Sequence, residues 1–405
     1  MPALPPDSTD SPPPSATPSS ELAAAELTGP PPPRAGSAPL AWRTNAWLFA
    51  ATVGSVLIAG YNTSLPRREA LLEAAQFTGA LLSILLSHEF GHFIAARIHK
   101  VDASLPYFIP LPFLSPFGTM GAVIRMRSVI PTRRALLDIG AAGPLAGLAL
   151  ALPLYAWGAS HSKVVAIDTL GDEGLQLGSS LVLRALDRMF GPTVPEGMDL
   201  LLSPVAFAAW TGMFVTMINL LPLGQLDGGH VAFSLFGPRQ NRIAPWVHRS
   251  MIVFFFVSVA SFVMRDIRAG LGFWHFGRHV NNSLFWLVLS EIVAVLGLLS
   301  SPSSRGQAGS DDRLGVRTRL FGAIGLALLA GLLRDETSPL AWSAWFLGLG
   351  VLLLMEARGG SLRSSSTLLD HPATGLEPLK WGRTAIAIVT LAFFALLFMP
   401  TPIGL

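Results

Sequence analysis

Long apolar runs, separated by shorter segments that carry most of the charge, make up most of this 405-residue chain. A helix that crosses the hydrocarbon core of a bilayer needs about 20 predominantly apolar residues. The pattern therefore predicts about nine spans, at residues 44–62, 74–98, 135–157, 202–223, 243–264, 283–300, 316–333, 340–356 and 384–400. The composition agrees, because 51% of the residues are hydrophobic and only 13% are charged. We expect an all-α polytopic membrane protein whose spans form a helical transmembrane bundle in the lipid bilayer.

Two proline-rich stretches depart from this helical pattern. Residues 1–42 are rich in Pro, Ser and Ala and lack apolar periodicity, so we predict a disordered cytoplasmic tail. Residues 105–126, "LPYFIPLPFLSPFGTMGAVIRM", are apolar, but their four prolines prevent a continuous helix. This second stretch suits a short membrane-associated β-hairpin or an extended re-entrant segment. The alternative is a loop that only caps the bundle.

The charged residues between the spans indicate an orientation rather than a nucleic-acid partner. Lys and Arg outnumber the acids in residues 97–134, whereas the acids are in excess in residues 158–200. The positive-inside rule then places residues 97–134 and the N-terminus in the cytoplasm, and we expect a cell inner membrane. The net charge of +3 belongs to this loop pattern, so no nucleic acid is expected. Because no cysteine is present, a metal site has to use His and carboxylate side chains.

Three ionisable side chains interrupt the second predicted span, in "SHEFGH" at residues 87–92. On a helix, His88 and His92 lie one turn apart on the same face, so both imidazoles can bind one metal ion at about 2.0–2.1 Å. Glu89 lies beside that face, where the glutamate of zinc hydrolases acts as general base. The structural alternative is a polar helix end that contacts lipid headgroups. Because ionisable groups within a membrane are costly, we favour a zinc site.

A catalytic zinc ion needs a third protein ligand and one open position. Asp227 is the strongest candidate because it lies in "NLLPLGQLDGGH", residues 219–230, where a proline and three glycines interrupt an apolar helix. Irregular backbone at membrane depth occurs only where it lines a cavity or is buried in protein. The alternative is that Asp227 is only an N-cap or turn residue. We interpret Asp138 as an interfacial charge partner, and Glu291 and Glu356 as partners within the bundle or span ends.

The third predicted span contains a stretch of small residues, "DIGAAGPLAG" at residues 138–147, which favours close helix packing. We interpret the histidines that share no metal-ligand spacing with the site as solvated or interfacial: His99, His161, His248, His275, His279 and His371. His230 follows Asp227 by three residues, and we expect it to face a loop.

Together, "SHEFGH" and "NLLPLGQLDGGH" resemble the motifs of the site-2 protease family of intramembrane zinc metalloproteases, in its plastid and bacterial type. The resemblance covers about residues 44–300. It implies an intramembrane metalloprotease core over residues 43–300, with further transmembrane helices over residues 301–405. We find no inserted soluble module, such as a PDZ domain, between the two motifs, which departs from the bacterial stress-signalling branch.

The same resemblance implies a role for each motif residue. His88, His92 and Asp227 would bind one Zn²⁺ per chain. Glu89 would be the catalytic base, and Asn219 would bind the substrate backbone near the metal. The implied reaction is hydrolysis of peptide bonds within or near transmembrane segments of membrane-protein substrates, as in regulated intramembrane proteolysis.

Two other interpretations stay open from the sequence. A different membrane zinc protease would take its third ligand from a Glu on a later helix, and Asp227 would then be dispensable. A non-proteolytic membrane protein, such as a metal transporter or an inactive protease relative, would need no catalytic base. A transporter favours paired broken spans in corresponding halves. We favour the protease, since only residues 222–229 show a convincing interruption and Glu89 is present.

Overall fold

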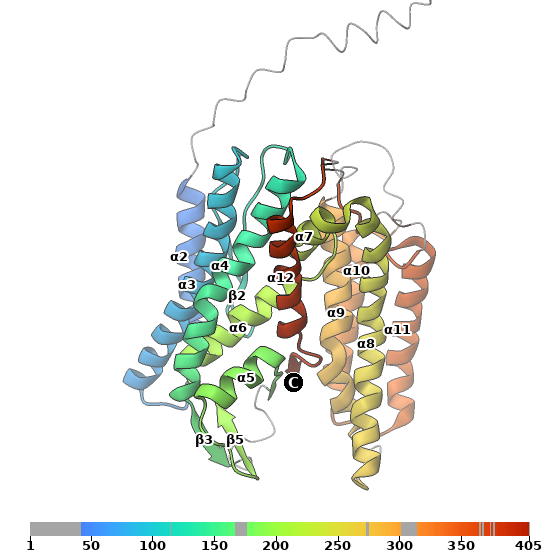
Figure 1. Cartoon of the computed structure of the whole chain (residues 1–405). Helices are drawn as coiled ribbons and strands as arrows, with labels where there is room; N and C mark the ends of the chain where they lie inside the picture. The colour runs from blue at the N-terminus through green and yellow to red at the C-terminus, as the bar shows by residue number, and fades with distance from the viewer. Residues whose placement is uncertain are drawn as a thin grey trace, which may run out of the picture. The chain divides into compact units, whose positions relative to one another are not determined.

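The computed structural model describes residues 42–404, except for residues 114, 167–175, 273–274, 301–313, 364–365, 367, 373 and 376. The predicted tail at residues 1–42 lies outside the described residues, apart from Trp42. The described chain is mainly helical (Figure 1). Its helices are α2 (Trp42–Ala59), α3 (Arg67–Ile98), α4 (Arg133–Ser160), α5 (Leu181–Phe190), α6 (Pro204–Asn219), α7 (Asp227–Phe236), the short 3₁₀ helix η2 (Gly237–Arg239), α8 (Gln240–Arg268), α9 (Phe276–Ser300), α10 (Val316–Leu332), α11 (Pro339–Gly359) and α12 (Trp381–Leu397).

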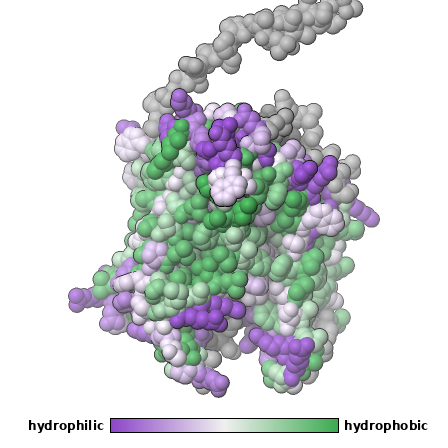
Figure 2. All heavy atoms as spheres, in the orientation of Figure 1, coloured by the Kyte–Doolittle hydropathy of each residue, from purple (hydrophilic) through white to green (hydrophobic). Residues whose placement is uncertain are grey.

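The helices have the length and composition of a membrane protein. A helix occupies each range that the apolar pattern predicts. Within the described residues, five helical segments are long and apolar enough to cross a membrane: Arg67–Ile98, Arg133–Ser160, Asp227–Arg268, Phe276–Leu299 and Leu340–Gly359. Figure 2 shows hydrophobic side chains over the middle of the visible face and hydrophilic ones gathered toward its two ends. The predicted helical membrane protein is confirmed, whereas the count of nine spans stays a prediction.

Small residues bring α3, α4 and α6 into close contact around one hydrophobic core. A Cβ atom added at Gly91 of α3 would lie 2.5 Å from the carbonyl oxygen of Ala142 on α4. One added at Gly158 of α4 would overlap Ala206 of α6. Larger side chains at these positions would separate the helices. The packing role predicted for the small residues of α4 is therefore confirmed.

Helices α8 to α11 pack around a second hydrophobic core, which includes Phe255 and Trp345. Arg319 of α10 is fully buried there and pairs with Glu356 of α11 at 2.5 Å and with Glu291 of α9 at 3.6 Å. The interpretation of both acids as partners within the bundle is therefore confirmed. Neither carboxylate is directed to the histidines of α3.

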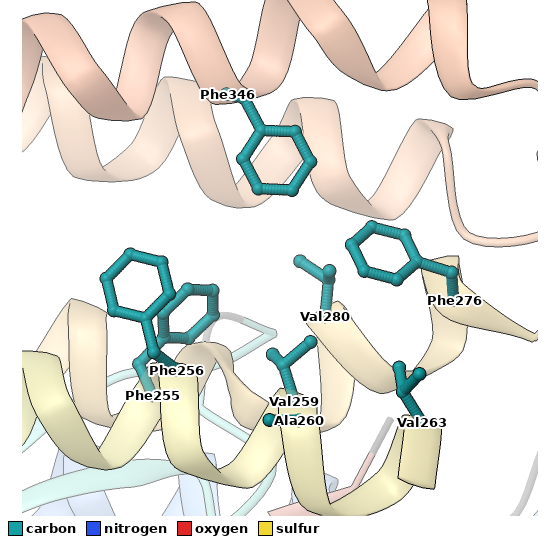
Figure 3. A pocket seen from close by; sticks show the side chains of 8 residues that line it. All are labelled: Phe255, Phe256, Val259, Ala260, Val263, Phe276, Val280 and Phe346. Atoms are coloured by element: carbon teal, nitrogen blue, oxygen red, sulfur yellow. The ribbon is translucent and has the colours of Figure 1, made fainter. Parts of the chain in front are cut away.

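An apolar cavity of about 290 Å³ lies between α8, α9 and α11. Figure 3 shows the side chains that line it: Phe255, Phe256, Val259, Ala260, Val263, Phe276, Val280 and Phe346. None of these side chains can bind a metal ion or transfer a proton. The candidate chemistry of this chain therefore lies outside the cavity.

The stretch predicted to be extended, residues 105–126, contains an antiparallel strand pair, β1 (Tyr107–Pro110) and β2 (Thr119–Val123). Asn45 of α2 anchors its start by donating to the Leu105 and Pro106 carbonyl oxygens at 3.0 and 2.8 Å. A strand pair is thus present, and its association with the membrane stays a prediction. Two further antiparallel pairs join β3 (Lys163–Ala166) to β5 (Met198–Leu201) and β4 (Gln176–Leu177) to β6 (Ile403–Gly404).

The last helix, α12, packs against α4 and α7, although four long helices separate it from α7 in the chain (Figure 1). Ala387 of α12 shares a buried cluster with Leu137 of α4 and Val231 of α7. Two guanidinium nitrogens of Arg383 donate to both carboxylate oxygens of Asp138 on α4 at 2.9–3.1 Å. The interpretation of Asp138 as a charge partner is confirmed. Helix α12 therefore belongs to the same packed unit as α4 and α7.

Candidate metal centre

Helix α3 places two histidines and a glutamate in a buried position. The helix runs without a break from Arg67 to Ile98, so the four-residue spacing stacks the imidazoles of His88 and His92 on one face. The exposed fractions of His88, Glu89 and His92 are only 4%, 6% and 7%. Ionisable side chains at such a place need partners, and α4 and α7 supply them for the two histidines.

Three donor atoms from α3 and α7 converge. The Nε2 atoms of His88 and His92 are 3.2 Å apart, and Asp227 Oδ2 lies 3.2 Å from the first and 3.3 Å from the second. Two ligands of a tetrahedral zinc ion, each bound at about 2.0–2.1 Å, are separated by about 3.3–3.4 Å. The triangle thus has the size of one face of such a site. Among the described residues, this is the one group of three His, Cys, Asp or Glu side chains close enough to share an ion.

Helix α4 orients and accommodates the two histidine rings. His92 Nδ1 donates to the Ile139 carbonyl oxygen at 2.7 Å, which leaves the Nε2 lone pair directed to the other donors. A Cβ atom added at Gly143 would overlap the His92 imidazole, and one at Gly147 would lie 3.3 Å from His88 Nδ1. The sequence pattern indicates only helix packing for this stretch. The structure adds that two of its glycines make room for the imidazole rings of His88 and His92.

The turn between α6 and α7 places Asp227 next to the histidines of α3. Helix α6 ends at Asn219, and α7 begins at Asp227 after a compact turn. Leu226 is the N-cap of α7, and the Asp227 carboxylate contacts the histidines of α3 instead of capping its own helix. Cβ atoms added at Gly228 or Gly229 would overlap backbone oxygens of the turn. The glycines therefore let the turn fold back onto the first residues of α7.

The remaining two predicted site residues lie at the same place. Asn219 Nδ2 is 3.5 Å from His88 Nε2. Glu89 follows His88 directly on α3 and is buried beside it. The structure thus brings together all five residues that the sequence singles out, and their individual roles stay predictions.

The part of the chain that contains these residues is similar in sequence to known proteins. Residues 76–260, which contain His88, His92 and Asp227, match the model of peptidase family M50. We call this matched range the M50 domain. The chain is 38% identical over 160 residues to the "Probable zinc metalloprotease EGY1, chloroplastic" of Arabidopsis thaliana, and 34% identical over 161 residues to its "Probable zinc metalloprotease EGY2, chloroplastic". The resemblance that the two motifs indicate is confirmed.

The similarity to these relatives extends over less than half of this chain. Each of the two alignments covers 39% of this chain, and they cover 29% of EGY1 and 28% of EGY2. The chain thus matches less than a third of the length of these relatives. No solved structure matches the chain.

Three histidines that the sequence spacing assigns to solvent or an interface are buried: His248, His279 and His371. That interpretation is wrong for all three, because each ring has a hydrogen-bonding partner inside the protein. The partners are the Ser290 carbonyl oxygen for His248 at 2.9 Å, Asp266 for His279 at 2.8 Å and His230 for His371 at 2.7 Å. His371 lies outside the M50 domain and contacts α7 through His230.

Proposed function

We propose that this chain is an intramembrane zinc metalloprotease that hydrolyses peptide bonds within or near transmembrane segments of membrane-protein substrates. The observation that carries the proposal is the triangle of donor atoms from His88, His92 and Asp227, set among apolar helices. The M50 domain and the relatives named as probable zinc metalloproteases support it.

The proposed reaction divides between the metal and two side chains. A bound zinc ion supplies Lewis acidity, which polarises a peptide carbonyl and lowers the pKa of water. The Glu89 carboxylate takes a proton from the attacking water and returns it to the nitrogen of the leaving amine. The Asn219 side-chain amide, next to His88, hydrogen-bonds the substrate backbone and orients the scissile carbonyl.

A transmembrane substrate has to unwind before it can be cut, because its amides are hydrogen-bonded within its own helix. The strand pair of β1 and β2 supplies a partner for the unwound segment, which would add to the sheet as a further strand. Met120 and Val123 of β2 are exposed and would contact substrate side chains. Substrates with helix-breaking residues near the cleavage point are therefore favoured.

We further propose nine spans, a catalytic core over residues 43–300 and a cytoplasmic N-terminus in a cell inner membrane. Basic residues at the starts of α4 and α12 lie at one end of the bundle, since Arg134 pairs with Glu377 and Arg383 with Asp138. A basic end belongs in the cytoplasm. The exposed Trp381, at the start of α12, suits the membrane interface.

The metal centre favours this proposal over a protease with a Glu third ligand. Asp227 supplies the third donor, and Glu291 and Glu356 pair with Arg319 instead. A metal transporter needs no general base beside its ion, whereas Glu89 lies next to His88.

The test is a set of substitutions in the purified full chain, scored for bound zinc and for cleavage of a transmembrane reporter. Glu89→Gln should keep zinc and lose cleavage, because only the proton acceptor is removed. Asp227→Ala should lose both zinc and cleavage. Glu69→Gln, an exposed glutamate on the same helix, is the matched control and should change neither. Cleavage by Glu89→Gln at the unmodified rate would refute the mechanism.

A further inference from the structure

The loop between α11 and α12, residues 360–380, lies beyond the M50 domain but is anchored to several of its helices. Asn241 of α8 exchanges two hydrogen bonds with the backbone of His371: its Oδ1 accepts from the His371 N–H at 3.0 Å, and its Nδ2 donates to the His371 carbonyl oxygen at 3.3 Å. Glu377 accepts from Arg134 of α4 at 3.3 Å. The backbone of His371 is thereby fixed relative to α8.

The His371 imidazole uses both ring nitrogens. Its Nδ1 donates to the Pro372 carbonyl oxygen at 2.7 Å, so its Nε2 carries the lone pair. That lone pair faces His230 Nδ1 on α7 at 2.7 Å, and the proton of this bond belongs to His230. Burial lowers the pKa of His371, which agrees with a neutral ring. The Phe233 ring of α7 stacks on the imidazole at 4.3 Å between centroids.

The contact acts on the part of α7 that carries the metal ligand. Asp227 and His230 are three residues apart and lie on neighbouring positions of the first helical turn. Helix α7 also packs closely against α4 at this residue, since a Cβ atom added at Gly140 would lie 2.8 Å from His230 Cβ. Helix α7 has only ten residues, and an irregular turn precedes it. Arg133 of α4 also holds the other end of α7 by donating to the Ser234 carbonyl oxygen at 3.1 Å, and η2 connects α7 to α8. The first-turn contacts are the ones closest in the chain to Asp227.

We propose that His371 is a positioning residue, which accepts the hydrogen bond of His230 and so holds α7 with Asp227 at ligand distance from His88 and His92. The inference rests on the metal site of the proposed function. It extends the catalytic unit beyond residues 76–260 to a loop that follows α11. His371 does not touch the metal donors, so its effect passes through His230 and the backbone of α7.

The test compares three variants of the full chain in detergent by zinc affinity, the visible spectrum of bound Co²⁺ and the thermal stability of the metal-free protein. His371→Leu removes the acceptor and should weaken zinc binding by about tenfold or more, with a changed Co²⁺ spectrum. His371→Gln keeps an acceptor oxygen and should stay within about threefold of the unmodified affinity. Lys380→Gln, at an exposed position of the same loop, is the matched control and should leave affinity and spectrum unchanged.

A double substitution separates positioning from a general loss of stability. If His371 acts through His230, then His230→Leu combined with His371→Leu should weaken zinc binding no more than the larger single effect. Should His371→Leu fail to fold, His371→Asn is measured in its place, because its shorter side chain leaves the His230 donor without its acceptor.

The inference is overturned if His371→Leu binds zinc with unmodified affinity and spectrum, or if His371→Gln loses as much affinity as His371→Leu. Its failure is distinct from that of the proposed function. A chain that cleaves no transmembrane reporter, but loses zinc affinity in His371→Leu, refutes the protease and supports the positioning role. Unmodified zinc binding by Asp227→Ala refutes both.

Discussion

Replacing Gly143 by alanine tests the geometry of the metal centre through a single methyl group. The added Cβ would overlap three atoms of the His92 imidazole, including the donor Nε2. To restore an ordinary contact, the ring has to move by about 1.4 Å, whereas zinc–ligand distances vary by only about 0.2 Å. The ring cannot simply swing aside, because its Nδ1 is bonded to the Ile139 carbonyl oxygen. We therefore expect Gly143→Ala to weaken zinc binding by about 100-fold or more and to abolish cleavage.

Alanine substitutions at two further glycines, Gly147 and Gly79, provide a comparison for Gly143→Ala. At Gly147 the added Cβ would lie 3.3 Å from His88 Nδ1, which requires a shift of a few tenths of an ångström, so zinc affinity should fall by less than about tenfold. At Gly79 of α3 no atom lies within 4 Å. Gly79→Ala should therefore keep full zinc affinity, and a helical alanine should add about 0.5–1 kcal/mol of stability.

The assay is zinc content and affinity by competition with a chelator, combined with cleavage of a transmembrane reporter by the same preparations. Circular dichroism of the metal-free variants reports whether the helices are retained. The reasoning is refuted if Gly143→Ala binds zinc as tightly as the unmodified protein, or if Gly147→Ala suffers the larger loss.

Three other outcomes follow from the structure. Chelation of zinc from the unmodified protein should abolish cleavage, and added zinc should restore it, measured with the same reporter. Arg319→Met leaves Glu291 and Glu356 without their buried cation and should destabilise the α8–α11 bundle by about 3–5 kcal/mol, measured by chemical denaturation; a double replacement of the acids by Gln should recover part of that loss. Because burial lowers the pKa of His371, the unfolded state binds its proton more readily, so the metal-free protein should lose thermal stability as the pH falls below about 6.5. His371→Gln should lose less over the same range.

The candidate site could be predicted wherever the relevant geometry is local in the chain. The i, i+4 spacing of His88 and His92 fixes their common face on any helix. Asp227 stood out because a proline and several glycines near a carboxylate are unusual in an apolar run. The ends of the spans were less predictable: α6 stops at Asn219, before the residues that break it, and α9 begins well before the predicted span.

What could not be predicted depends on contacts between distant parts of the chain. The space that Gly143 and Gly147 leave for the ligand rings follows from how α4 crosses α3, and a pattern of small residues indicates only that some helix comes close. The burial of His371 depends on partners about 130 and 141 residues away, Asn241 and His230. Spacing within a motif holds no information about such a partner.

The position of α12 near the end of the chain affects the order in which the protein can assemble. The ribosome synthesises α7, which carries Asp227, before α8, α9, α10 and α11, and α12 follows all of them. Val231 of α7 therefore cannot pack against Ala387, and Asp138 of α4 cannot pair with Arg383, until α12 has been synthesised. A nascent chain that already contains His88, His92 and Asp227 thus still lacks α12. This helix packs against α4 and α7. The order of synthesis therefore delays full packing around the candidate metal centre until α12 is in place.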